Sequence, residues 1–308
     1  MNDAAPLATR TLEACAACGG RRLRALPLVY EFRGAFPLVE CRDCGLRFLR
    51  VQPAGEGLAG LYSAGYFDSD FRCGRSPAAY DSAETFRAEN EALLDEFERL
   101  GPRGRLLEVG SAGGWLLRQA GGRGWRAQGV ELSVAAAQQA RELGLQVFQG
   151  DLLAAALPAS SFDLVYMGDV LEHVPDCRAV LEEAVRLLRP GGHLYLRGPV
   201  TTNSLARRLG LALYGAAGRR IVLREPPYHL WEFTPASLAR LFHAAGLAVR
   251  SARQSKIPPG RAHGEKSATQ RLAMAAVDAL NLPLTRLLGV AGDRIVVVGR
   301  KPRQRAGP

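Results

Sequence analysis

Four cysteines near the start of the chain form two matched pairs whose spacing is typical of a metal site. Cys15 and Cys18 make one Cys-x-x-Cys pair, Cys41 and Cys44 make the other, and a glycine follows each pair. Each pair predicts a tight turn with inward-facing thiols, and four thiolates from two such turns suit tetrahedral zinc. A redox pair or a coincidence is the alternative. Because four protein ligands close such a site, we expect zinc to be structural here.

A second group of residues surrounds a glycine-rich turn. The run Gly110–Gly114 follows the apolar residues 105–107 and leads into the apolar residues 115–117. This order predicts a buried strand, a tight turn and a helix whose first N–H groups are free. Dinucleotide enzymes bind phosphate at such turns, but Glu108 would repel phosphate. A ligand with positive charge suits the turn better, such as the sulfonium and ammonium groups of S-adenosylmethionine (SAM).

Three more acidic residues follow successive predicted strands. Glu131 comes 21 residues after Gly110, Asp151 follows the third strand, and Asp169 follows the fourth. In a parallel sheet, ligands bind at the carboxyl ends of the strands, so these acids are expected to converge on one site. A carboxylate at Glu131 suits the two hydroxyls of a ribose. Each acid taken alone is more often a helix cap or a solvated loop residue, but four in succession favour a shared role.

This arrangement resembles class I SAM-dependent methyltransferases over about residues 80–300, with Ala112 in place of the family's middle glycine. The resemblance implies that Asp151 lies near the adenine and that Asp169 borders the methionine and the acceptor. A nicotinamide oxidoreductase is the structural rival, but it needs no carboxylate inside the turn. The residues expected to bind SAM are Glu108, Gly110, Ser111, Ala112, Gly114, Glu131, Leu132, Asp151, Leu152, Met167 and Asp169.

Asp169, Glu172 and His173 are spaced by three and four residues, which predicts one face of a single helical turn. In one interpretation His173 is a general base, because imidazole titrates near neutral pH. In another, Asp169 caps the turn and His173 shapes the pocket wall. In a third, all three side chains bind a divalent ion.

The same segment is similar to that of ubiquinone-pathway O-methyltransferases and small-RNA 2′-O-methyltransferases, which bind a divalent ion at acid-x-x-Glu-His. The RNA group has a second histidine in His-x-x-Glu-x-Thr, and residues 229–234 match that motif. The resemblance implies a second metal site, for Mg²⁺ or another divalent ion, at Asp169, Glu172, His173 and His229. It also makes His229 a catalytic candidate beside His173 and Asp169.

Alternating strands and helices from residue 104 onward predict an α/β fold with a doubly wound, seven-stranded, Rossmann-like sheet. Residues 12–50 are expected to form a self-contained, zinc-ribbon-like unit, residues 51–79 a linker, and residues 80–300 the catalytic domain. Lid insertions are expected at 199–230 and 254–292, the latter with a helix at 267–280, and residues 301–308 form a basic tail. Strands are predicted at 104–109, 126–130, 145–149, 162–167, 192–197, 247–251 and 294–299, and helices at 80–100, 114–122, 133–143, 176–189 and 235–245.

The net charge of +10 invites a nucleic-acid or anionic-membrane interpretation. Lysine is rare, however, and the arginines are scattered, which together with abundant Ala, Gly and Leu indicates GC-rich coding. We therefore do not expect a nucleic-acid partner. The first residues lack a signal-peptide pattern, and no apolar run reaches the length of a membrane span. We expect a soluble, cytoplasmic protein.

The expected activity is methyl transfer from SAM to a hydroxyl, in preference to a carbon, of a small molecule. Residues 168–171 lack the Asn/Asp-Pro-Pro-Tyr turn that accompanies methylation of nucleobase nitrogens. A zinc unit joined to such a domain resembles bacterial enzymes that methylate nucleotide sugars or polysaccharide precursors, and a secondary metabolite is a further candidate acceptor. The alternatives are an RNA 2′-O-methyltransferase that binds RNA through its zinc unit, and a non-catalytic SAM-binding protein.

Overall fold

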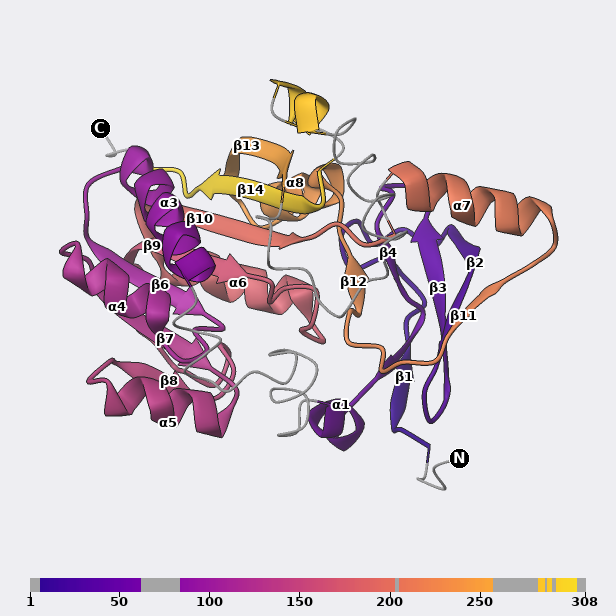
Figure 1. The fold of residues 1–308 in the computed structure, drawn as a ribbon, viewed down its shortest axis with the longest axis horizontal. Helices are drawn as coiled ribbons and strands as arrows, with labels where there is room; N and C mark the ends of the chain where they lie inside the picture. Colours follow the sequence, from indigo (N-terminus) through magenta and orange to yellow (C-terminus); the bar gives the residue numbers. More distant parts are fainter. Residues whose placement is uncertain are drawn as a thin grey trace, which may run out of the picture.

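The computed structural model describes residues 6–61, 84–202, 205–256, 282–285, 287–289 and 292–303, which form a larger and a smaller lobe (Figure 1). A seven-stranded sheet is the centre of the larger lobe, and a five-stranded sheet is the centre of the smaller one. A separate antiparallel ribbon pairs β1 (Thr9–Thr11) with β5 (Val51–Pro53).

The larger sheet confirms the predicted doubly wound fold. Its β14 is antiparallel to both neighbours, and the remaining neighbouring strands run parallel. The chain reverses its direction of travel across the sheet between β6 and β9, which is where ligands bind in open α/β sheets. The strand order is β13 (Ala248–Ser255), β14 (Arg294–Arg300), β10 (Leu188–Pro199), β9 (Phe162–Gly168), β6 (Arg105–Val109), β7 (Arg126–Glu131) and β8 (Val147–Gln149).

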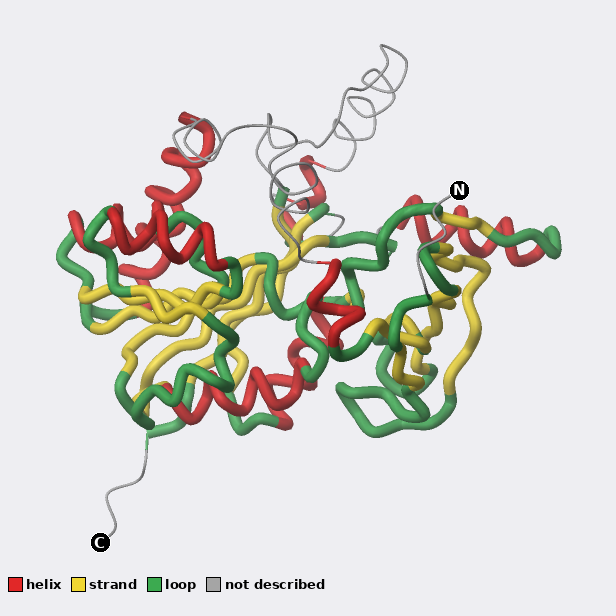
Figure 2. The backbone as a smooth tube through the Cα atoms, turned by 90° about the horizontal axis from the view of Figure 1, so that it is seen from below, coloured by secondary structure: helices red, strands yellow, loops and turns green. Residues whose placement is uncertain are grey.

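Helices cover both faces of this sheet (Figure 2). Alternation of side chains along the strands explains the two layers, because Leu106 packs with α3 and α4 whereas Leu107 packs with α6 and α8. Ser133, Asp176 and Thr234 cap the helices α5, α6 and α8 through their side chains. The helices are α3 (Glu84–Leu100), α4 (Trp115–Gly122), α5 (Val134–Glu142), α6 (Cys177–Leu187) and α8 (Pro235–Ala244).

The smaller sheet confirms the predicted small N-terminal sheet, and it also takes in strands from a distant part of the chain beyond residues 12–50. The antiparallel strands β2, β3 and β4 lie within that range, but β11 pairs with β2 and β12 pairs with β4. Helix α7 (Leu205–Ala216) also lies against β2. The strand order is β11 (Ile221–Leu223), β2 (Leu23–Glu31), β3 (Ala35–Cys41), β4 (Arg47–Leu49) and β12 (Trp231–Glu232).

The segments expected to be linkers and lids are only partly described. Strand β5 and helix α1 (Glu56–Leu61) fall in the expected linker at 51–79, and the rest of that linker lies outside the described residues. The predicted helix at 267–280 lies outside them too. Lid roles for 199–230 and 254–292 stay predictions. No helix in the described ranges combines the length and apolar character needed to cross a membrane.

Candidate active site and cysteine cluster

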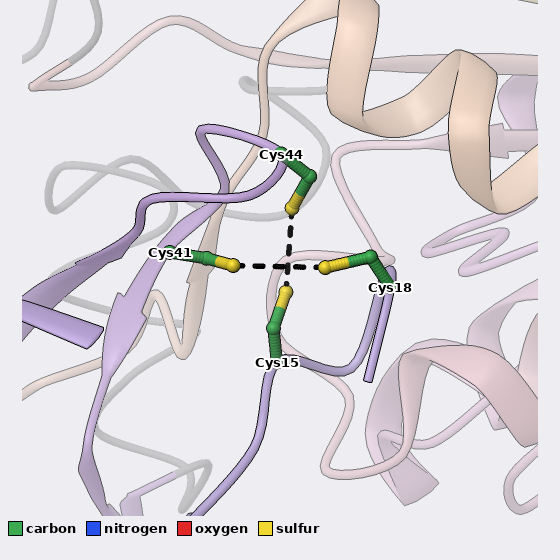
Figure 3. Close-up of side chains that lie close together, drawn as sticks. All are labelled: Cys15, Cys18, Cys41 and Cys44. Atoms are coloured by element: carbon green, nitrogen blue, oxygen red, sulfur yellow. Dashed lines mark hydrogen bonds between the residues drawn. The ribbon is translucent and has the colours of Figure 1, made fainter. Parts of the chain in front are cut away.

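The four predicted cysteine ligands converge on one point in the smaller lobe (Figure 3). Their sulfur atoms all lie within 4.8 Å of one another. The Sγ atoms of Cys15 and Cys44 are 3.4 Å apart, and those of Cys18 and Cys41 are 3.6 Å apart. Tetrahedral zinc with Zn–S bonds of about 2.3 Å places its sulfurs about 3.8 Å apart. The cluster therefore fits structural zinc.

Two turns of the same geometry present these thiols. The N–H of Gly19 donates to the carbonyl of Cys15, and the N–H of Gly45 donates to that of Cys41, both at 2.8 Å. Both glycines adopt positive φ, at 71° and 76°, a conformation that disfavours other residues. Cys177 is a buried thiol in α6 and is not one of the four clustered cysteines.

Glu108 is a buried carboxylate at the end of β6, beside the glycine turn. Its side chain is 7% exposed, and its Oε2 has no hydrogen-bond partner among the described residues. Burial raises the pKa of Glu108 well above its usual value, and the nearby Glu131 raises this pKa further. A cationic ligand would pair with this oxygen and would offset the repulsion between Glu108 and Glu131. The turn therefore fits a sulfonium donor such as SAM.

Glu131 ties the glycine turn to the end of the neighbouring strand β7. Its Oε2 accepts a hydrogen bond from the N–H of Ala112 at 2.8 Å, and its Oε1 accepts one from the N–H of Ser133 at 2.7 Å. Gly110 is the tight point of the turn, because an added Cβ would lie 2.5 Å from Val170. The carboxyl ends of β6 and β7 thus meet at the glycine turn, as predicted.

The remaining predicted SAM contacts differ in exposure. Asp151 is exposed, and its Oδ1 accepts a hydrogen bond from the N–H of Ala154 at 2.7 Å, so it caps a local turn. Leu132 is 55% exposed, whereas Leu152 and Met167 are buried. A bond from Asp151 to adenine stays a prediction, as do the individual roles of the other residues.

Glu172, His173 and His229 come together beyond the end of β9. Their candidate ligand atoms all lie within 4.8 Å of one another, and the two imidazole rings are 4.8 Å apart at their centroids. Nε2 of His173 lies 4.0 Å from Oε1 of Glu172. Two segments more than fifty residues apart thus supply one cluster, which we call the His–Glu cluster.

Asp169 is not a member of the His–Glu cluster. Its backbone adopts the left-handed conformation with φ of 55°, and residues 171–173 form a turn in place of a helix. Helical spacing therefore does not apply across residues 169–173. The structure assembles three of the four residues expected at the second metal site; Asp169 is outside this group but near enough for its charge to act on Glu172.

The electrostatics of the His–Glu cluster favour neutral imidazoles. Burial lowers the pKa of His173, and burial together with the neighbouring His173 lowers the pKa of His229 to about 3. Burial, and then the charge of Asp169, raises the pKa of Glu172 well above its usual value. Nδ1 of His173 lies 3.0 Å from the carbonyl oxygen of Tyr228, which can only accept, so Nδ1 carries the proton. Nε2 of His173 is then the basic nitrogen.

The predicted His-x-x-Glu-x-Thr motif is divided among three tasks. The ring of His229 lies tilted against that of His173, Glu232 accepts a hydrogen bond from the N–H of Thr202 at 3.2 Å, and Thr234 caps α8. Only the histidine of this motif joins the His–Glu cluster.

Strand β12 holds His229 in place, and sequence reasoning missed this strand. The N–H groups of Leu230 and Trp231 both donate to the carbonyl of Glu172, at 2.9 Å and 3.2 Å. Nε1 of Trp231 donates to the carbonyl of Val174 at 2.7 Å. A strand of two residues is too short to show a periodic pattern in the sequence. Its own Trp-Glu pair was the sole signal that could have indicated it.

The sheet order, the glycine turn at the switch point and the buried acids at successive strand ends define a Rossmann-like, SAM-dependent methyltransferase. A family described as a methyltransferase domain matches residues 83–252, which is more than half of the chain. The chain belongs to this family, within the class I SAM-dependent methyltransferases.

Similar proteins agree with this assignment. A ubiquinone biosynthesis O-methyltransferase of Xanthomonas axonopodis pv. citri is 36% identical over 158 residues, covering 48% of this chain and 65% of that protein. One of Cupriavidus pinatubonensis is 29% identical over 154 residues, covering 46% of this chain and 59% of that protein. The chain thus spans less than two thirds of these curated relatives. A SAM-dependent methyltransferase of Archaeoglobus fulgidus shares the fold, with a TM-score of 0.51, 16% identity, and coverage of 78% of this chain and all of that chain.

Proposed function

We propose that the protein transfers the methyl group of SAM to a hydroxyl of a small-molecule acceptor, with His173 as general base. The observation that carries this proposal is the partly buried His173, 18% exposed, whose pKa is lowered and whose Nδ1–H donates to a carbonyl, so that Nε2 is the basic nitrogen. The similarity to ubiquinone biosynthesis O-methyltransferases supports oxygen as the acceptor atom. A sugar, a polysaccharide precursor and a secondary metabolite are the acceptor classes we favour.

The reaction is an in-line displacement for which the protein supplies position and a proton acceptor. SAM supplies a methyl group bound to a sulfonium. The sulfur part of SAM leaves as the neutral thioether when the carbon–sulfur bond breaks. The acceptor oxygen forms the new carbon–oxygen bond and loses its proton to Nε2 of His173. Glu108 and Glu131 hold the donor end of the site, and the partly exposed His173 is open to the acceptor.

The His–Glu cluster also offers a carboxylate oxygen and two imidazole nitrogens, a donor set suited to a borderline divalent ion. An ion there would occupy Nε2 of His173 and would polarise the acceptor hydroxyl in place of proton removal by the imidazole. The two variants of the mechanism differ in whether added Mg²⁺ or Mn²⁺ raises the rate.

The proposal is tested by incubating the protein with methyl-labelled SAM and a panel of nucleotide sugars and phenols. For any acceptor that is labelled, His173→Ala is expected to lower the rate by a factor of about 10²–10⁴, the contribution of general-base catalysis. His243→Ala is the matched control, because His243 is an exposed histidine of α8. Full activity in His173→Ala would contradict the base role.

Metal dependence is measured on the same reaction without removing zinc. We expect the rate to be unchanged by added Mg²⁺ or Mn²⁺ if His173 is the base. A rate that rises with the added ion, and that falls in Glu172→Gln, would instead assign the His–Glu cluster to a divalent ion.

A further inference from the structure

We propose that Arg10 and Gln52 form a positioning pair that fixes His173 and His229 relative to each other; this inference rests on the proposed function of that cluster. Arg10 lies in β1 and Gln52 in β5, and the two residues are register partners in the β1–β5 ribbon. The guanidinium of Arg10 donates to Oε1 of Gln52 at 2.8 Å. Gln52 is fully buried, at 0% exposure.

Each member of the pair binds the backbone next to one of the two histidines. Nε2 of Gln52 donates to the carbonyl of Leu230, the residue that follows His229, at 3.3 Å. The guanidinium of Arg10 donates to the carbonyl of Pro175, two residues after His173. The hydrogen-bonded pair therefore spans the two segments that carry the imidazoles.

The contact from Gln52 is not needed to satisfy the backbone. The carbonyl of Leu230 also accepts the N–H of Leu49 at 3.1 Å, so loss of the Gln52 side chain would not orphan it. Burying a polar amide is costly unless its hydrogen bonds are made, and an apolar side chain of the same length would fill the space at lower cost. The retained amide is therefore explained by the geometry that it imposes.

The pair also connects the N-terminal part of the chain, which contains the cysteine cluster, to the His–Glu cluster. Strand β5 follows directly after β4, whose Phe48 packs against Trp231 with ring centroids 5.7 Å apart. Trp231 in turn binds the carbonyl of Val174, beside His173. The N-terminal part of the chain thus contacts both histidine segments through side chains and acts as a positioning element for them.

The test is a nuclear magnetic resonance spectrum of protein labelled with ¹⁵N at histidine. The chain has five histidines, so the imidazole signals are few, and His173→Gln and His229→Gln variants assign two of them. Gln52→Met keeps the length of the side chain and removes its hydrogen bonds. We expect this variant to shift the signals of His173 and His229, to leave that of His193 in place, and to change the Kd for SAM less than about twofold.

Thr9→Ala is the matched control, because Thr9 is an exposed neighbour of Arg10 in β1. It is expected to leave all five signals in place. Arg10→Met provides the second variant should Gln52→Met not fold, and the double variant is expected to act no more strongly than either single one, because the two residues work as one unit. Unchanged signals of both histidines in a folded Gln52→Met or Arg10→Met protein would overturn the proposal.

The spectra separate this inference from the proposed function. Shifted histidine signals without methylation of any acceptor would uphold the positioning pair and count against His173 as base. With an acceptor in hand, kcat in Gln52→Met is expected to fall by a factor of up to about 10², the cost of displacing a catalytic group by about 1 Å. A fall in kcat with both histidine signals in place would contradict the positioning role.

Discussion

At the scale of single residues, Glu108 decides whether the donor site is assigned correctly. Its unpaired buried oxygen is suited to a cation, so Glu108→Gln keeps the shape of the site while removing the charge. We expect the Kd for SAM, measured by calorimetry, to rise about tenfold to a hundredfold, since hydrogen bonds to charged groups contribute about 1.5–3 kcal/mol. Glu142→Gln, at an exposed position of α5, is the control. An unchanged Kd in Glu108→Gln would place the cationic end of SAM elsewhere.

His229 makes stability depend on pH in a predictable direction. Its pKa is about 3 in the folded protein and about 6.5 when unfolded, so below pH 6.5 the unfolded chain binds a proton that the folded state does not. The contribution of neutral His229 to the free energy of unfolding is therefore fully present above pH 6.5 and is lost as the pH falls. Between pH 7.5 and pH 5 this one group is expected to cost the wild type about 2 kcal/mol of unfolding free energy.

Urea denaturation at the two pH values measures this effect. Between pH 7.5 and pH 5, the free energy of unfolding should fall by about 2 kcal/mol more in the wild type and in the exposed-site control His243→Gln than in His229→Gln. The comparison between variants cancels the titration of Glu108, Glu172 and the cysteines, which all of these proteins share. Equal losses in all three proteins would mean that His229 is accessible to protons in the folded state.

Residues placed by sheet topology were predictable from the sequence, and those placed by an irregular turn were not. Glu108 and Glu131 meet because the ends of adjacent parallel strands must meet. Asp169 misses the His–Glu cluster because its left-handed backbone breaks the helical spacing on which the prediction relied. The approach of His229 to His173 followed from a family resemblance; periodicity gave no sign of it.

At the scale of elements, the cysteine turns show what local sequence determines. Both were predictable because each is closed by hydrogen bonds within five residues. Strands β11 and β12 were not, because they contain three and two residues and pair with strands far away in the chain. Short strands of this kind form only when their partner is already in place, so their own residues carry little signal.

The cysteine cluster gives a prediction at this scale. Cys18→Ser is expected to lower the zinc content, measured by elemental analysis, from one ion per chain to well below one, and to lower the melting temperature. Cys177→Ser replaces a buried thiol of α6 that lies outside the cluster, and its zinc content should match the wild type. One zinc ion per chain in Cys18→Ser would exclude the four-cysteine site.

At the scale of the whole molecule, ion pairs engage part of the positive charge that a nucleic acid would otherwise attract. Although the net charge is +10, arginines in both lobes form ion pairs with carboxylates, such as Arg24 with Glu40 and Arg123 with Asp95. An arginine that is paired with a carboxylate neutralises a phosphate less well and so releases fewer counterions from a nucleic acid. Part of the positive charge is therefore engaged within the protein.

Strands β11 and β12 lie in the sequence between strands β10 and β13 of the larger sheet but complete the smaller sheet, and this makes the effect of truncation predictable. Removing residues 1–53 would expose Leu230, Trp231 and Phe233, which are now at most 5% exposed, and would leave β12 without its partner β4. Each of these side chains loses about 1.5–3 kcal/mol of burial, a large part of the stability of an ordinary domain. We expect the fragment 54–308 to lack a cooperative thermal transition. A monomeric fragment that unfolds cooperatively and binds SAM with the Kd of the full chain would instead show that the larger lobe folds alone, and that β12 is stable without the sheet it completes.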